Sequence, residues 1–338
     1  MNLKRKTRRT IKSITAITVM LILCTLVIFI AVNTGSLKVG FMQMLRGLFI
    51  EYDADVATVY DLRFPRIFIG VLAGAALSVA GVLLQAVLKN SLADPGIIGV
   101  SSGAKFITVI VAAAFPGIYS HVTIFSFLGG LFAFGIVYGI SMRHGYSSLK
   151  IILVGIAVQA LFTGLSDAVN SFSGGTVSNV AAIVDGNITL KTWDDVRLLA
   201  MFAIPGLILS FFCIHWCDLM ALEEKTVRGL GMNVKMMQLI VSIVAVLLAS
   251  SVTAICGVVG FLGLLVPHIG RLIVGNSHKV LIPFSMCLGA FIYLSADTLG
   301  RTICYPYEIS AAVLMNVIGG PVFILLLQRS RLSNGKAF

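Results

Sequence analysis

Apolar runs of about twenty residues recur along the whole chain and are separated by short polar segments. A hydrocarbon core about 30 Å thick requires roughly this length of helix. The sequence shows none of the alternating ten-residue segments that are typical of membrane β-barrels. The pattern therefore predicts an all-α polytopic membrane protein with about ten transmembrane helices. The predicted spans are 14–32, 64–88, 95–115, 122–141, 151–171, 197–216, 237–256, 257–273, 281–300 and 309–327, and the pattern does not fix the limits of the eighth.

Composition supports this class and charge gives an orientation. Hydrophobic residues make up 58% of the chain and charged residues only 12%, whereas soluble domains carry about 25% charged residues. A net charge of +11 in a soluble protein would suggest nucleic acid, but here basic residues gather before the first span, at Lys4–Arg9, and after the last. By the positive-inside rule both termini are predicted to be cytoplasmic. We expect a basic cytoplasmic tail (1–13), one transmembrane domain (14–328) and a second cytoplasmic tail (329–338).

The first apolar run has the basic start of a secretory signal. It is long enough to span a membrane and lacks a small-residue cleavage site, so we interpret it as a retained helix.

Motifs for covalent chemistry are missing from the sequence. It contains no G-x-x-x-x-G-K-[ST] loop, no G-x-S-x-G elbow and no Cys-x-x-Cys pair, and its five His are dispersed. We therefore predict no enzyme activity, no metal site and no cofactor bound by this chain. An ion-coupled transporter would need ionisable groups inside the membrane. Lys105, Asp167 and Asp297 are the candidates, with both aspartates expected near water at the outer ends of their spans, so a secondary transporter stays open as an alternative.

The stretch Leu88–Lys105, "LKNSLADPGIIGVSSGAK", interrupts two membrane-length segments with polar and turn-forming residues. Asp94-Pro95-Gly96 is a turn sequence. It follows a helix whose small residues, such as Gly70-x-x-x-Gly74, allow close helix packing in lipid. Non-helical backbone at membrane depth is tolerated where protein or a water-filled cavity surrounds it. We expect residues 89–104 to form a turn at the cytoplasmic mouth of a pathway, and an ordinary loop is the alternative.

Five further stretches resemble motifs of one protein family, in the same order and at the same spacing along the chain. Together with Leu88–Lys105, the chain resembles the iron-siderophore, haem and cobalamin permeases, which are membrane subunits of type II ABC importers. The stretches are Asp61–Gly70, Ile152–Phe162, Ala254–Gly275, "LSADTLGR" from Leu294 and "EISAAVLMNVIGGPVFILLL" up to Leu327. The resemblance covers nearly the whole chain and implies the type II importer architecture in a bacterial cytoplasmic membrane.

The resemblance also implies roles for arginines on the outer side. Arg63, Arg66 and Arg301 match external arginines that pair with acidic residues on a substrate-binding protein. The planar fork of arginine suits this task, because it can meet a carboxylate with two hydrogen bonds. Anchoring to lipid headgroups is the alternative.

On the cytoplasmic side the resemblance implies a gate. Its residues are Asn90 and Leu92 of the turn, and Ser148 and Leu149 before the fifth helix. Ser91 stands where the family usually has proline, which should make the turn less rigid.

The loop Asp218–Lys235 resembles the segment that couples such permeases to their ATPase. Glu224, Arg228, Leu230 and Gly231 match that segment, while several neighbours depart from it, and a solvated loop is the alternative. Pro267-His268 invites a metal-ligand interpretation, but a lone His at a helix bend is more often structural. We expect the segment His268–Lys279, with Arg271 and Lys279, to add to the cytoplasmic face beside the ATPase.

The sequence thus predicts a permease subunit of an ABC importer. Its expected partners are ABC ATPase subunits that use the ATP, a second permease that is identical or a sister chain, and an external substrate-binding lipoprotein. Ferric siderophore is the first expectation for the cargo and haem the second, with cobalamin also open, and both rest on the family alone. Lys105 replaces a small residue and would favour an anionic cargo if it lines the passage. A proton-coupled exporter and a structural scaffold are the rivals from other classes.

Overall fold

The computed structural model describes residues 2–34, 39–142, 148–172, 187–189, 191–304 and 307–334. In these segments all regular structure is helical. The helices are α1 (Asn2–Asn33), α2 (Phe41–Phe49), α3 (Ala54–Leu62), α4 (Phe64–Val87), α5 (Val100–Ala114), the 3₁₀ helix η1 (Pro116–His121), α6 (Val122–Met142), α7 (Ser148–Phe172), α9 (Trp193–Phe212), α10 (Ile214–Met220), α11 (Glu224–Gly229), α12 (Val234–Cys256), α13 (Leu262–Val274), α14 (His278–Ile303) and α15 (Ala311–Asn334).

Each predicted span has a helix in the structure. Among the described residues, seven segments are long and apolar enough to cross a membrane on their own, and α5, α13 and the apolar part of α15 are shorter. The polytopic all-α prediction is therefore confirmed, while ten full crossings are not established. At the ends of the chain, α1 begins at Asn2 and α15 continues to Asn334, so the described parts of both predicted tails are helical.

Two of the short helices begin later than predicted because positive backbone φ angles stop them. Gly99 has φ 84°, so α5 begins at Val100 and the turn ends there rather than at residue 104. Gly257 (φ 70°) and Phe261 (φ 64°) likewise keep the first residues of the eighth predicted span out of α13. For a bulky residue such as Phe261 this conformation is rare.

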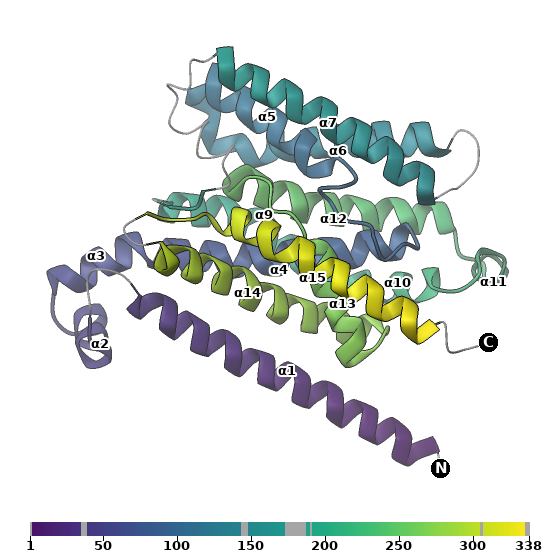
Figure 1. Cartoon of the computed structure of the whole chain (residues 1–338), viewed down its shortest axis with the longest axis horizontal. Coiled ribbons are helices and arrows are strands. Elements are labelled where there is room, and N and C mark those ends of the chain that lie inside the picture. The colour runs from purple at the N-terminus through teal and green to yellow at the C-terminus, as the bar shows by residue number, and fades with distance from the viewer. Residues whose placement is uncertain are drawn as a thin grey trace.

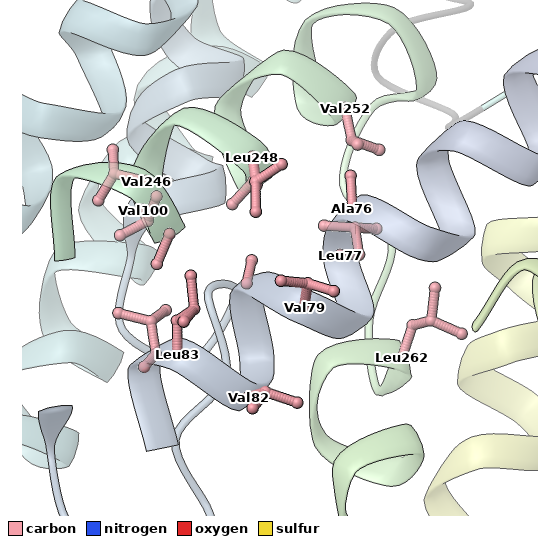
Figure 2. Packing of buried hydrophobic residues seen from close by; sticks show 14 of the residues in the cluster. Ala76, Leu77, Val79, Val82, Leu83, Val100, Val246, Leu248, Val252 and Leu262 are labelled. Carbon is pink, nitrogen blue, oxygen red and sulfur yellow. The ribbon is translucent and has the colours of Figure 1, made fainter. Parts of the chain in front are cut away.

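Helix α4 is the central element of the bundle. It packs against α14, α12, α9 and α13, and most of its residues are buried. Figure 2 shows apolar side chains of α4 facing α12 and α13, with Ala76, Leu77, Val79, Val82 and Leu83 opposite Val246, Leu248, Val252 and Leu262. Figure 1 places α1 along one edge of the bundle, and α5, α6 and α7 along the opposite edge.

Small residues permit the close crossings that this packing needs. A Cβ atom added at Gly74 of α4 would collide with the backbone of Gly289 in α14, and one added at Gly81 would collide with the carbonyl group of Gly263 in α13. The predicted small-residue face of α4 is thus the face where neighbouring backbones come closest.

The two ends of the bundle differ in what they carry. Figure 1 shows both chain ends and α11 at one end, and α2 and α3 at the other. We call these the α11 face and the α3 face. The link between α14 and α15 follows the C-terminus of α14 at the α3 face, and the turn after α4 lies at the α11 face, where Lys89 Nζ donates to the carbonyl oxygen of Leu222 at 2.8 Å.

Candidate functional site

Charged side chains gather at the α3 face, in what we call the Arg66 cluster: buried Arg66 and Asp297, partly buried Arg301 and the more exposed Glu308. Arg66 at the start of α4 makes two contacts from Nε to the Asp297 carboxylate, at 2.9 and 3.0 Å, and a third from Nη2 at 2.8 Å. Its Nη1 donates to Glu308 Oε2 at 2.8 Å. One guanidinium therefore joins α4, α14 and the link that follows α14.

Arg301 completes the cluster from the last turn of α14. Its side chain is 9% exposed, and its Nε lies 3.4 Å from Asp297 Oδ2, one helical turn away. The Nε and Nη2 atoms have no hydrogen-bond partner among the described residues. Arg301 is thus held near a carboxylate while part of its donor capacity is unused.

Glu308 connects this cluster to the segment before α9. Its Oε2 also accepts a hydrogen bond from Thr189 Oγ1 at 2.8 Å. Burial alone would raise the pKa of Glu308, but the hydrogen bonds from Arg66 and Thr189 outweigh it and hold that pKa below its ordinary value. The sequence pattern did not single out Glu308 or Thr189, because neither lies near Arg66 along the chain.

The structure places the three predicted docking arginines in different surroundings. Arg66 is 6% exposed, and its guanidinium is occupied by internal carboxylates, so it does not present a free cation to a partner. Arg63 is half-buried and donates from Nη1 to the carbonyl oxygen of Val32 in α1 at 2.9 Å. Asp297 is fully buried, which corrects the expectation that water reaches it.

The turn Leu88–Gly99 is an ordered element at the α11 face. Asn90 Oδ1 accepts from the backbone N of Leu92 at 2.9 Å, and Asp94 Oδ1 accepts from the backbone N of Gly96 at 2.8 Å. Both side chains therefore close turns on their own backbone. The expected turn is confirmed, and Asn90 shapes it from within.

Helices α7 and α13 pack closely against this turn. A Cβ added at Gly155 of α7 would lie 2.7 Å from the carbonyl oxygen of Ile97, and one at Gly263 of α13 would lie 2.7 Å from Asp94 Oδ2. Asp94 is 3% exposed. Burial raises the pKa of Asp94 to about 6, against hydrogen bonds from the backbone of Gly96 and Ile97 that lower it.

The first predicted gate segment is the turn, and the second is the start of α7, of which the backbone alone is described. The turn reaches α7, whose helix begins at Ser148 and Leu149. The side chains of those two residues lie outside the described part of the chain.

Two side-chain hydrogen bonds of Gln85 connect α4 and α13 beside the turn. Gln85 Nε2 donates to the carbonyl oxygen of Gly263 at 3.1 Å, and Arg271 Nη1 donates to Gln85 Oε1 at 2.5 Å. Arg271 therefore links α13 to the last turns of α4.

His268 Nε2 has no hydrogen-bond partner in the described segments, and its ring meets Phe323 edge-on at 6.5 Å. No group of metal-ligating side chains occurs among the described residues.

Helix α11 projects at the α11 face and carries the predicted coupling residues. Glu224 Oε1 pairs with Arg228 Nη2 at 2.5 Å, one helical turn along, and both side chains are exposed. Leu230 is 61% exposed, and Gly231 has φ 76°, a conformation that glycine adopts at little cost. The structure thus brings these four residues to one protruding element.

Two contacts join α10 and the residues that precede α11 to the turn and to α14. The bond from Lys89 to Leu222 connects the turn to the residues just before α11. Asp218 Oδ1 accepts from both the backbone N (2.9 Å) and Nδ1 (2.7 Å) of His278 at the start of α14. Sequence reasoning did not identify Lys89, since a lysine at a membrane boundary is ordinarily a headgroup anchor.

Lys105 is the one buried lysine among the described residues. It is 7% exposed, and its Nζ lies 3.8 Å from Asp167 Oδ1 on α7, too far for a hydrogen bond. The Asp167 side chain is 58% exposed. An accessible carboxylate therefore sits beside a sheltered ammonium group.

Comparison with known proteins covers most of the chain. Residues 21–329 match the FecCD transport family. The chain is 37% identical over 317 residues to the "Probable heme-iron transport system permease protein IsdF" of Staphylococcus aureus strains MSSA476 and Newman, covering 92% of this chain and 96% of each relative.

Solved structures share the fold. One, described as a metal-chelate type ABC transporter in an inward-facing conformation, aligns with a TM-score of 0.79 at 24% identity and covers 94% of this chain and 99% of that chain. PsaBC from Streptococcus pneumoniae aligns with a TM-score of 0.55 at 16% identity, covering 85% of this chain and 95% of that chain. The chain belongs to the FecCD transport family and is a multi-pass membrane permease of an ABC importer, without enzyme activity of its own.

Proposed function

We propose that this permease carries haem iron into the cell. The observation that supports this most is identity of 37% across nearly the full length of a relative named as a heme-iron permease. The order expected from sequence, with ferric siderophore first and haem second, is thereby reversed. Haem carries two propionate groups, and the sheltered Lys105 offers a cation for such an anion.

We propose that the α11 face is cytoplasmic, because the basic segment Lys4–Arg9 lies in the first turns of α1 at that end. Helix α11, with Glu224, Arg228, Leu230 and Gly231, then docks on an ABC ATPase subunit. Movement of α11 passes through the Lys89–Leu222 contact to the turn at Asn90 and Leu92, which acts as the gate. Arg271 and His268 support this face from α13.

The α3 face then meets the external binding protein. We assign docking to Arg63 and Arg301, which internal carboxylates occupy less fully than Arg66, and we assign Arg66 to holding α4, α14 and Glu308 in place for them. Two permeases, identical or sister chains, flank the passage, and Lys105 and Asp167 contribute to its lining.

Growth on defined iron sources tests the cargo. The permease would be expressed with its cognate ATPase and binding lipoprotein in a bacterial host that lacks its own haem and siderophore importers. We expect growth when haemin is the sole iron source and none on ferric hydroxamate siderophore. Growth on the siderophore and not on haemin would contradict this proposal and support ferric siderophore as the cargo.

A further inference from the structure

A cavity of about 880 Å3 opens at the α11 face between α1 and the connection from α13 to α14. Lys12 of α1, Arg271 of α13 and Lys279 of α14 line it together with Ile14, Ile17 and Leu272. None of its lining residues belongs to the turn Leu88–Gly99 or to α11, although Arg271 and Lys279 come from the segment expected at the cytoplasmic face.

The charges in this cavity are all of one sign. Three cations from three helices line it, and none of its lining residues is acidic. The side chains of Lys12 and Lys279 are exposed, and neither forms an ion pair with a side chain that the structure describes. Arg271 is held in place through its bond to Gln85. The cavity thus offers an anion several cations, one of which is already positioned.

The apolar walls of the cavity and its level in the membrane indicate that the ligand of these cations also has an apolar part. Ile14 and Leu272 are 60% and 65% exposed. The apolar part of α1 begins at Ile11, α13 ends at Val274 and α14 begins at His278, so the three cations lie at the ends of membrane-spanning segments. This is the level of lipid headgroups, and basic pockets between helices on the cytoplasmic side bind acidic lipid headgroups. A soluble protein partner would gain nothing from an apolar wall that continues along the lipid-facing helix α1.

We propose that this cavity binds an acidic phospholipid of the inner leaflet, with its headgroup phosphate between Lys12, Arg271 and Lys279 and an acyl chain along Ile14 and Leu272. The bound lipid fills the gap between α1 and α13, whose Arg271 is bonded to Gln85 of α4. It fastens the peripheral helix to the part of the bundle that encloses the turn.

Lipid retention by the intact transporter tests this site. The full assembly would be released in mild detergent, mixed with phosphatidylglycerol or with phosphatidylcholine of the same acyl chains, and observed by native mass spectrometry. We expect retention of phosphatidylglycerol over phosphatidylcholine. Because each lysine near an acidic headgroup contributes about a fivefold preference, Lys12→Gln with Lys279→Gln should lower phosphatidylglycerol retention about 25-fold and leave phosphatidylcholine unchanged.

A matched pair of substitutions provides the control. Lys225→Gln with Lys235→Gln removes the same charge from the same face outside the cavity, and should retain phosphatidylglycerol as the wild type does. Equal losses in both double variants would show a general charge effect and overturn the proposal. Displacement of the lipid by excess inorganic phosphate would identify a simple anion site instead. Crosslinking of Lys12 to the ATPase, with exclusion of lipid, would assign the cavity to protein docking.

Discussion

At the scale of single residues, Arg66 shows how a buried charge can be tolerated. Its three nitrogen atoms all face carboxylate oxygens of Asp297 and Glu308 at 2.8 to 3.0 Å. Breaking a buried pair leaves an uncompensated charge, which is far costlier than losing an exposed pair. The same geometry withdraws Arg66 from an external partner.

Arg66→Ala is therefore expected to lower stability rather than docking alone. Loss of the buried pair should cost about 3–5 kcal/mol, seen as a clear fall in the apparent melting temperature of the detergent-solubilised protein. Arg63→Ala is the control, because Arg63 is only half-buried, and should change the melting temperature little. An Arg66→Ala protein with wild-type stability and weakened binding of the external protein would restore Arg66 to the docking surface.

Asp94 gives a pH dependence of definite sign. Its pKa in the folded protein is about 6, against an ordinary value near 3.9. The fold favours the protonated form, so the contribution of this carboxyl group to the free energy of unfolding is complete below about pH 4. As pH rises from there through 6, about 3 kcal/mol of that free energy is lost. Asp94→Asn keeps an oxygen acceptor for the Gly96 N–H and removes the charge.

We expect the melting temperature of Asp94→Asn to fall less between pH 5 and pH 8 than that of the wild type. Asp61→Asn changes an exposed carboxylate at the other face and should keep the wild-type slope. If Asp94→Asn also kept that slope, the carboxyl group would not be titrating against burial.

Lys105 bears on the choice of cargo. If its ammonium group faces the passage, replacing it with alanine should slow import of anionic chelates more than of neutral ones, because only anions lose an attractive partner. Uptake rates of one anionic and one neutral iron chelate, measured with Lys105→Ala and with the wild type, provide the comparison. An equal reduction for both would rule out selection by charge at this position.

At the scale of elements, the crossing of α4 and α13 positions the turn. Gly81 and Gly263 bring the two backbones together, Gln85 bonds across them, and Asp94 fills the space beside Gly263. Close approach of this kind depends on the missing side chains. A methyl group at Gly81 would separate the helices and shift the turn.

Gly81→Ala should accordingly destabilise the protein by about 1–3 kcal/mol or more, as expected when a packed core is overfilled. Gly135→Ala is the matched control within α6, where nothing lies within 4 Å of the added atom, and helix propensity there favours alanine by up to about 1 kcal/mol. Melting temperatures of the two variants should move in opposite directions. A harmless Gly81→Ala would mean that the crossing is looser than described.

The elements were largely predictable from sequence, and their contacts were not. Hydropathy located all ten apolar segments, and Asp94-Pro95-Gly96 marked the turn, because these signals are local. Gly257 and Phe261 shortened the eighth segment through backbone angles that hydropathy does not report. The pairing of Arg66 with Glu308 joins residues far apart in the chain, so only the fold could reveal it.

At the scale of the whole molecule, the two faces are connected through α4. Arg66 anchors its beginning in the cluster at the α3 face, and its end leads directly into the turn at the α11 face, where Lys89 contacts the residues before α11. A rigid, buried helix thus joins the proposed docking surface to the proposed gate. This arrangement suits a permease whose energy comes from a partner ATPase, since the chain itself has no nucleotide-binding loop.

Haem uptake into sealed proteoliposomes tests the central claim most directly. The vesicles would contain the permease with its ATPase, enclose ATP, and receive haem-loaded binding protein from outside. We predict uptake that requires both ATP and the binding protein and that persists when an uncoupler removes the proton gradient. Uptake that collapses with the uncoupler at constant ATP, or that proceeds without the binding protein, would contradict the account.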